Sequence, residues 1–193
     1  MQITIPYAPR ELQLEIHEQL AKHRWAVLSL HRRAGKSVMC INELIKRALT
    51  NKLWNPRYAY IGPTYKQTKS IIFDYLKHYA GVIPGIKFNE QELSCTFPNG
   101  AKITLLGSEN PDSLRGNYFD GIIADEYAQI NPRLFPEIIR PALSDRKGFC
   151  YMVGTPQGMS NDFYAKYQHA LQDDAWYTNC LLYTSDAADD MQC

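Results

Sequence analysis

The sequence lacks any close pairing of cysteines. Its cysteines are scattered along 193 residues without a C-x-x-C pair, at Cys40, Cys95, Cys150, Cys180 and Cys193. Structural zinc sites and disulfide scaffolds depend on closely spaced or evenly paired cysteines. The pattern therefore argues against both kinds of site and predicts buried thiols instead.

Long apolar runs and a strong net charge are also missing. No stretch approaches the ~20 apolar residues of a membrane span, and the opening MQITIPYAPREL has no cationic-then-apolar signal pattern. These absences predict a cytosolic chain without membrane contact.

The formal net charge is +1, but all 21 Lys and Arg precede residue 181 and three aspartates follow it, which leaves +4 on the preceding part. A mild positive charge permits nucleic-acid binding without requiring it.

A strand, a polar loop and a helix are expected between Trp25 and Leu49. The apolar run WAVLSL is followed by a polar loop that ends in GKS at residues 35–37. Apolar side chains then recur at helical spacing, at Val38, Ile41, Leu44, Ile45, Ala48 and Leu49. Backbone N–H groups at the start of such a helix have no intrahelical partner and lie at the positive end of the helix dipole. This arrangement binds phosphate groups.

The GKS triplet matches the end of a G-x-x-x-x-G-K-[ST] phosphate loop. In that loop the glycine at the position of Gly35 lets the backbone approach the phosphates, Lys36 adds a mobile positive charge, and the Ser37 hydroxyl binds Mg²⁺. The first glycine of the pattern is missing, because Leu30 occupies its position and residues 31–33 fill the loop. A lone triplet is common by chance. Its place between a strand and a helix makes nucleotide binding the favoured interpretation.

A second motif places two acids directly after an apolar strand. The segment FDGIIADEYAQI leads through residues 122–124 into Asp125 and Glu126. In P-loop ATPases one carboxylate at such a place holds Mg²⁺ and the next polarises the attacking water. A strand that ends in a solvated acidic turn is the alternative, and the phosphate loop upstream makes it the weaker one.

Strands and helices alternate from residue 25 onward. This order predicts an α/β fold with a mainly parallel sheet and helices on both faces, and the GKS loop with the acid pair indicates the P-loop NTPase (RecA/ASCE-like) kind. Functional residues of such sheets gather at the carboxyl ends of the strands, and Lys36, Asp125, Glu126 and Thr155 each follow a predicted strand at that end. One hairpin is expected around residues 98–100, because an Asn-Gly between two β-rich runs is a strong turn signal.

Two weaker signals concern ligands. The amide of Gln13, on a predicted helix, can donate and accept at once against the edge of an adenine, but a solvated helix residue is the alternative that the residues alone favour. Lys66, Lys69 and Lys77 alternate with tyrosines on a later predicted helix, whose apolar face includes Ile71. Such a face can contact a nucleic-acid backbone, although a solvated helix surface is the more common meaning of the pattern.

Several motifs together resemble those of the ATPase domain of the large terminase subunit, the motor that packages DNA into the capsids of tailed phages. They occur in that family's order and spacing from about Tyr7 to about Leu171, as HRRAGKS, IGPTYKQTKSI, DSLRG, DEYAQI, IRPALSD and GTPQG. The resemblance implies that Gln13 lies in an adenine motif. It also implies a variant phosphate loop, in which the missing first glycine is a family feature.

The resemblance further implies roles for individual residues. ATP would be bound by the loop residues Arg32, Arg33, Ala34, Gly35, Lys36 and Ser37. Asp125 would join Ser37 as a ligand of Mg²⁺, and Glu126 would be the catalytic acid. Thr155 would belong to the coupling motif that senses the γ-phosphate. Arg115, in the LRG loop, is a candidate beside Arg32 for stabilising the charge of the transition state.

The implied function is ATP hydrolysis that powers the translocation of viral DNA into a procapsid. The expected partners are double-stranded DNA, the phage portal protein, the small terminase subunit and further copies of the chain in a ring. The expected location is the cytoplasm of an infected bacterium, with transient docking on the procapsid.

Two other functions share part of this pattern. A DEAD-like helicase has a Gln motif, a G-K-[ST] loop and a D-E pair, but it needs a second RecA-like domain, for which the chain has no room. A non-catalytic nucleotide-binding adaptor is the other rival. Glu126 argues against it, because binding needs the metal-side acid but no catalytic one.

Residues 1–180 are expected to form the ATPase domain, and residues 181–193 a tail that is foreign to it. The tail LLYTSDAADDMQC differs in composition and resembles the translation of a sequencing-adapter remnant. Its Asp186, Asp189 and Asp190 therefore do not predict a nuclease site. Complete large terminases carry a C-terminal nuclease domain with clustered acids that bind two metals, and this sequence is too short to hold one.

Overall fold

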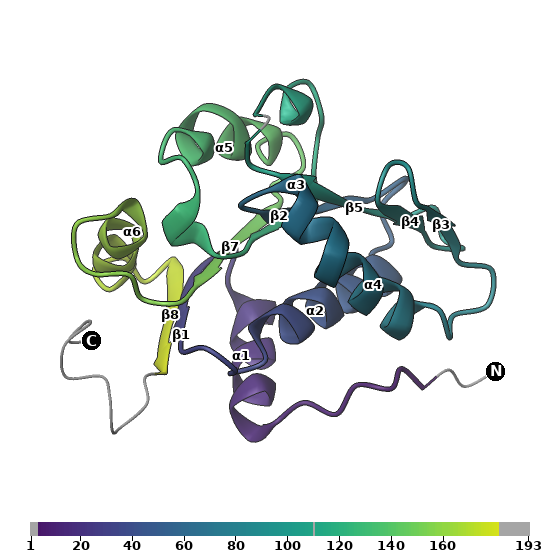
Figure 1. The fold of residues 1–193 in the computed structure, drawn as a ribbon, viewed down its shortest axis with the longest axis horizontal. Helices are drawn as coiled ribbons and strands as arrows, with labels where there is room; N and C mark the ends of the chain where they lie inside the picture. The colour runs from purple at the N-terminus through teal and green to yellow at the C-terminus, as the bar shows by residue number, and fades with distance from the viewer. Residues whose placement is uncertain (1–3, 110, 182–193) are drawn as a thin grey trace.

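A computed structural model of the chain describes residues 4–109 and 111–181. Eight strands form one sheet in the order β3-β4-β5-β2-β6-β7-β1-β8, and helices lie on both sides of it (Figure 1). Within the described ranges, no helix is long and apolar enough to cross a membrane. The predicted α/β class is confirmed.

The central part of the sheet is parallel, as predicted. Its strands are β1 (Trp25–Leu30), β2 (Arg57–Gly62), β5 (Lys102–Gly107), β6 (Gly121–Ala124), β7 (Phe149–Gly154) and β8 (Trp176–Leu181). These six strands pair with one another in parallel, in the order β5-β2-β6-β7-β1-β8. Strands that are covered on both faces read as continuous apolar runs, which is why the sequence reveals them. The edge strand β8 is only half-buried along its length. Its sequence mixes polar and apolar residues, so no continuous apolar run predicts it.

The predicted hairpin forms at one edge of the sheet. β4 (Ser94–Thr96) pairs antiparallel with β5 across the turn at residues 98–100. Gly100 adopts a φ of 83°, which favours glycine in this turn. A third short strand, β3 (Lys87–Asn89), extends the hairpin and was not expected. It is too short to show a period in the sequence.

Helices cover both faces of the sheet. One face is covered by α1 (Glu11–Lys22), α2 (Lys36–Thr50) and α4 (Phe73–Ala80), whose apolar residues share one core cluster with the strands. The other face is covered by α5 (Arg140–Ala142), α6 (Asp162–Ala170) and the turns between β6 and β7, around a second cluster. These turns include a 3₁₀ turn at Tyr127–Gln129 and a π-helical segment at Phe135–Ile139. Another 3₁₀ turn, at Pro111–Leu114, precedes β6.

The helix predicted after Thr64 changes its winding halfway. α3 (Tyr65–Gln67) passes through a π-helical segment at Thr68–Ile72 into α4. A π-helix has a wider turn than an α-helix and so shifts the positions of the side chains that follow. Ile71, which was expected on the buried face, is 53% exposed. That part of the sequence-based prediction is wrong, because the α-helical period does not hold across this turn.

The strand β8 includes the first residue that the sequence assigned to the tail. Leu181 ends β8, and its carbonyl oxygen accepts a hydrogen bond from the backbone N–H of His31 at 2.9 Å. Leu181 therefore belongs to the sheet, and the foreign origin of the residues after it stays a prediction. Asp186, Asp189 and Asp190 lie outside the described residues.

Removal of residues 182–193 is expected to leave the melting temperature unchanged, because this polar segment has few apolar side chains to bury. Removal of residues 176–193 serves as the control. It also deletes β8, including Trp176, whose ring stacks on that of Trp25, and should lower the melting temperature by ~5 °C or more. A clear destabilisation by the shorter deletion would show that the tail belongs to the native fold.

Candidate active site

The phosphate loop connects β1 to α2 at the carboxyl edge of the sheet. β1 ends at Leu30, which is buried in the core, and α2 begins at Lys36. Gly35 precedes the helix with a φ of 77°, and a Cβ at this position would lie 2.8 Å from Nε2 of Gln13. This left-handed backbone conformation favours glycine, and a side chain would also have to displace the amide of Gln13. Leu30 stands in place of the usual first glycine and acts as the last core residue of the strand.

Lys36 lies inside this loop. Its ammonium donates hydrogen bonds to the carbonyl oxygens of Leu30 at 3.3 Å and His31 at 3.2 Å, and to Oγ1 of Thr155 at 2.9 Å. It also lies 4.0 Å from Oε1 of Glu126. The contacts are with neutral oxygens and one half-exposed carboxylate, so the lysine can exchange them for phosphate oxygens. The predicted grouping of Lys36, Glu126 and Thr155 is present.

Ser37 and Asp125 converge as a pair of oxygen ligands. Oγ of Ser37 donates to Oδ2 of Asp125 at 3.2 Å, and the other carboxylate oxygen, Oδ1, accepts the backbone N–H of Glu126 at 2.9 Å. The hydroxyl of Tyr60 also donates to Oδ2 of Asp125. A hydroxyl and a carboxylate are hard oxygen ligands of the kind that Mg²⁺ takes in nucleotide sites. The residues present therefore fit this ion.

Glu126 faces the pocket from a strained turn. Its backbone adopts the left-handed conformation with a φ of 49°, which is uncommon for a residue other than glycine and is often found at functional sites. Burial raises the pKa of Glu126, and the charge of Asp125 adds to this. Lys36, the backbone N–H of Thr155 and Arg32 oppose the increase without cancelling it. Four other predicted site residues, Asp125, Lys36, Thr155 and Arg32, therefore act on the carboxylate that was predicted to be catalytic.

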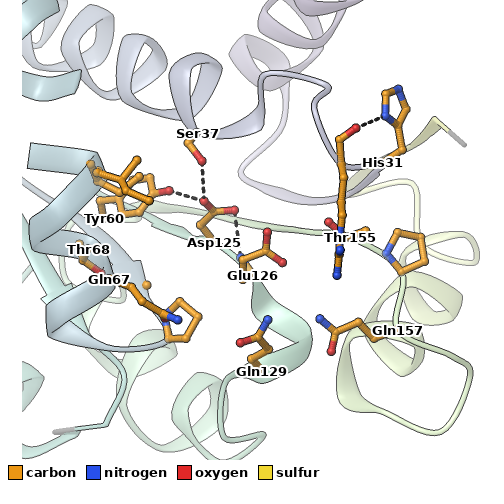
Figure 2. A pocket seen from close by; sticks show the side chains of 16 residues that line it. His31, Ser37, Tyr60, Gln67, Thr68, Asp125, Glu126, Gln129, Thr155 and Gln157 are labelled. Carbon is orange, nitrogen blue, oxygen red and sulfur yellow. Dashed lines mark hydrogen bonds between the residues drawn. The ribbon is translucent and has the colours of Figure 1, made fainter. Parts of the chain in front are cut away.

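A pocket of about 750 Å³ opens over these residues. Figure 2 shows Ser37, Asp125, Glu126 and Thr155 around it, from the ends of different strands and the helix α2. Of the predicted residues, Arg32 lines it as well. The sequence did not single out several other lining residues, namely Tyr60, Gln67, Thr68, Ile71, Gln129 and Gln157. All of them except Tyr60 lie within the motifs IGPTYKQTKSI, DEYAQI and GTPQG, which was the available signal.

Gln13 lies behind the phosphate loop and is buried, so it is not a solvated helix residue. Its Nε2 donates to the carbonyl oxygens of Ala34 at 3.3 Å and Gly35 at 3.5 Å, and its Oε1 accepts the backbone N–H of Arg10 at 3.0 Å. The amide thus joins the start of α1 to the loop. To contact an adenine, the amide of Gln13 would have to give up some of these hydrogen bonds. Its role in binding adenine stays a prediction.

The three predicted arginines lie in different surroundings. Arg32 lines the pocket, and its charge lowers the pKa of Glu126. Arg33 is exposed and has a φ of 66°, which turns the loop toward Gly35. Arg115 lies outside this pocket and lines a separate depression with Glu137 and Asp145. The structure therefore does not bring Arg115 to the site of its own chain.

A buried polar network holds α2 against α1. Glu43 is fully buried and accepts hydrogen bonds from Nδ1 of His17 at 2.6 Å and Nε of Arg47 at 2.7 Å. The hydroxyl of Tyr7 is 3.0 Å from the other ring nitrogen of His17. Burial alone would raise the pKa of Glu43, but the hydrogen bonds and the charges of Arg47 and Lys46 outweigh it and hold the pKa below its usual value. No pattern in the sequence predicted this hydrogen-bond network around Glu43.

The sequence matches a known family. The family described as terminase large subunit, T4likevirus-type, N-terminal matches residues 27–191. The terminase large subunit of Thermus virus P23-45 is 30% identical over 181 residues, which covers 82% of this chain and 36% of that protein. The chain thus spans little more than a third of the length of this curated relative.

Solved structures agree on the fold. A mutant of the large terminase ATPase domain of Thermus phage P74-26 has a TM-score of 0.78 at 23% identity, covering 92% of this chain and 82% of that one. The large terminase of a thermophilic bacteriophage, solved in complex with ADP, has a TM-score of 0.74 at 15% identity, covering 89% of this chain and 44% of that one. At these identities the likeness shows the fold alone. Because the family match covers most of the chain, the chain belongs to the terminase large subunit family and contains the N-terminal part that this family describes.

Proposed function

We propose that this chain hydrolyses ATP to drive double-stranded viral DNA into a procapsid. The observation that carries the proposal is that Ser37, Asp125, Glu126 and Thr155 line one pocket, with Lys36 in contact with Thr155 and Glu126 beside it. A phosphate-binding helix start, two ligands for a hard cation and a second acid with a raised pKa are the parts that phosphoryl transfer needs. The terminase family and the ADP complex of one relative support ATP as the nucleotide.

Each residue then has a distinct task. The backbone N–H groups at the start of α2 and the ammonium of Lys36 hold the phosphates. Ser37 and Asp125 bind Mg²⁺, which when bound neutralises phosphate charge. Glu126 orients and polarises the attacking water. Thr155, bonded to Lys36 at 2.9 Å, responds to the γ-phosphate when the lysine exchanges its contacts.

The proposed partners follow from the family. They are double-stranded DNA, the portal protein, the small terminase subunit and further copies of the chain in a ring, and the proposed location is the host cytoplasm with transient docking on the procapsid. Lys66 and Lys69 are exposed beside the pocket, whereas Lys77 forms ion pairs with Asp74 at 3.3 Å and Glu90 at 3.5 Å. The first two lysines are therefore the better candidates for contacting a DNA backbone.

The direct test measures ATP turnover by a full-length version of the protein. Turnover is expected to require Mg²⁺ and to rise when DNA and empty capsid–portal complexes are added. Stimulation by DNA or RNA alone, with strand separation and no effect of capsids, would favour a helicase. Binding of ATP without turnover under every condition would favour an adaptor.

The variant Lys36→Ala is expected to lose ATP binding and hydrolysis while the fold survives. The substitution removes three hydrogen bonds, to the carbonyl oxygens of Leu30 and His31 and to Oγ1 of Thr155, but no ion pair shorter than 4.0 Å. Lys46→Ala is the matched control, because Lys46 lies on the same helix and its side chain points to Glu43, away from the pocket. Nucleotide affinity measured by calorimetry and melting temperature separate the two effects. Wild-type turnover in Lys36→Ala would refute the phosphate-loop assignment.

A further inference from the structure

Tyr60 contacts the metal-side acid from the neighbouring strand. It lies on β2, is 1% exposed, and its hydroxyl donates to Oδ2 of Asp125, the oxygen that also accepts Oγ of Ser37 (Figure 2). Together with the backbone N–H of Glu126 on Oδ1, this gives the carboxylate a donor on each oxygen from a rigid part of the fold. Sequence motifs and family resemblance assign no role to Tyr60.

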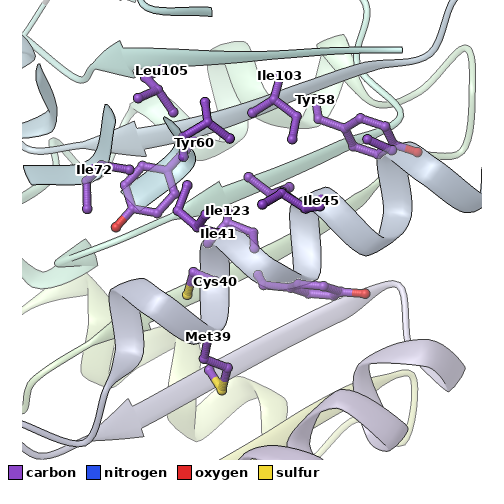
Figure 3. Packing of buried hydrophobic residues seen from close by; sticks show 14 of the residues in the cluster. Met39, Cys40, Ile41, Ile45, Tyr58, Tyr60, Ile72, Ile103, Leu105 and Ile123 are labelled. Atoms are coloured by element: carbon purple, nitrogen blue, oxygen red, sulfur yellow. The ribbon is translucent and has the colours of Figure 1, made fainter. Parts of the chain in front are cut away.

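The strand register explains why the contact forms. β2 and β6 pair in parallel with Tyr60 opposite Ile123, and the backbone N–H of Asp125 donates to the carbonyl of Ile61 at 2.9 Å. The ring of Tyr60 packs among apolar residues on the α2 side of the sheet, with Ile72, Leu105 and Ile123 nearby (Figure 3). Backbone pairing and ring packing thus hold the hydroxyl at one place.

We propose that Tyr60 is a positioning residue for the Mg²⁺ site, which rests on the proposed assignment of Ser37 and Asp125 as its ligands. The hydroxyl of Tyr60 is neutral, so it can orient the carboxylate of Asp125 without competing with Mg²⁺ for its negative charge, as a cationic side chain would. Groups that hydrogen-bond to a metal ligand fix its orientation, and their loss typically costs ~10–100-fold in metal affinity or activity. Tyr60 thereby preserves the direction of Asp125 when Ser37 turns its own oxygen toward the ion.

The chain contains a matched control on the same strand. Tyr58 lies two residues earlier, so it points to the same face of the sheet, and it is also buried, at 2% exposed. Its hydroxyl accepts from Nδ2 of Asn51 at 2.7 Å and donates to the carbonyl of Arg47 at 3.1 Å, at the far end of α2. Replacement of either tyrosine by Phe removes one buried hydroxyl, but only Tyr60 touches the metal-side acid.

The experiment measures the affinity of ADP for the wild type, Tyr60→Phe and Tyr58→Phe as free Mg²⁺ is titrated, together with melting temperatures. We expect Tyr60→Phe to raise the half-saturating Mg²⁺ concentration by about tenfold, with the affinity for metal-free ADP unchanged, and Tyr58→Phe to change neither. In an Asp125→Asn background, Tyr60→Phe should add little, because it acts through that carboxylate.

The outcomes separate this inference from the proposed function. Equal Mg²⁺ dependence in Tyr60→Phe and the wild type would overturn the role of Tyr60, as would an equal change in Tyr58→Phe. A wild type whose ADP affinity ignores Mg²⁺ would instead overturn the metal site itself. If Tyr60→Phe does not fold, Tyr60→Met replaces it. This variant also keeps an apolar side chain without the hydroxyl, and the Mg²⁺ dependence of its ADP affinity is measured in the same way.

Discussion

Glu126→Gln is expected to bind ATP with Mg²⁺ and to lose about 10²- to 10⁴-fold in turnover, the range that general-base or water-orienting groups contribute. The substitution preserves the size of the side chain and removes the charge that polarises water. Ser37 and Asp125, which hold the metal in the proposed mechanism, remain intact, and so does the hydrogen bond between Lys36 and Thr155. Nucleotide affinity should therefore change far less than the turnover number.

Asp125→Asn provides the comparison. Loss of the Asp125 carboxylate should first raise the Mg²⁺ concentration that nucleotide binding needs. This carboxylate is the proposed metal ligand and accepts a hydrogen bond from Ser37 at 3.2 Å. Calorimetry with and without Mg²⁺, followed by single-turnover hydrolysis, distinguishes the two variants. Identical behaviour of Asp125→Asn and Glu126→Gln in the binding assay would contradict their separate roles.

The second large effect concerns the arginines. Phosphoryl transfer spreads negative charge over the transferring oxygens, and an arginine placed there in cis or from a neighbouring subunit is worth ~10³–10⁵ in rate. Arg32 lines the pocket of its own chain, so we expect it to act in cis and Arg32→Ala to abolish turnover. Arg115 is exposed and lies outside that pocket. Its guanidinium could serve only the site of another copy of the chain in a ring.

Mixed rings of full-length subunits distinguish cis from trans action. Each Arg→Ala subunit is combined with Glu126→Gln subunits, and ATPase activity is measured in the assembled motor. A cis arginine cannot be rescued, because its own site lacks the charge and the site of its neighbour lacks the glutamate. A trans arginine can be rescued, because an Arg115→Ala subunit retains Glu126 and can borrow the arginine of the neighbour. Recovery with Arg32→Ala would overturn our assignment, and recovery with Arg115→Ala alone would identify a trans-acting loop.

Features that depend on nearby residues in the chain could be predicted from the sequence. The phosphate loop between β1 and α2, the strand before Asp125 and the hairpin at residues 98–100 are each encoded within a short segment. Parallel topology then follows from the alternation of strands and helices, since the carboxyl ends of parallel strands meet at one edge. This is why Lys36, Asp125 and Thr155, far apart in sequence, were expected at one site.

Features that depend on partners across the fold could not be predicted in this way. The contact of Tyr60 with Asp125, the burial of Gln13 against the loop and the enclosure of Glu43 by His17 and Arg47 each join different elements. A hydrogen-bonding side chain looks the same in the sequence whether it meets solvent, a ligand or a buried carboxylate. Its role is decided by which group packing brings within about 3 Å.

The sequence by itself thus determined the family, the α/β class and the candidate residues for the phosphates and the metal, because these are local motifs with a required order. The tertiary structure alone decided that Ile71 faces the pocket, that β8 closes one edge of the sheet and that Arg115 lies in a separate depression. These outcomes depend on the winding of a π-helical turn, on strand pairing and on loop direction. Each of them is a balance of packing and hydrogen bonding over the whole domain, which no single segment encodes.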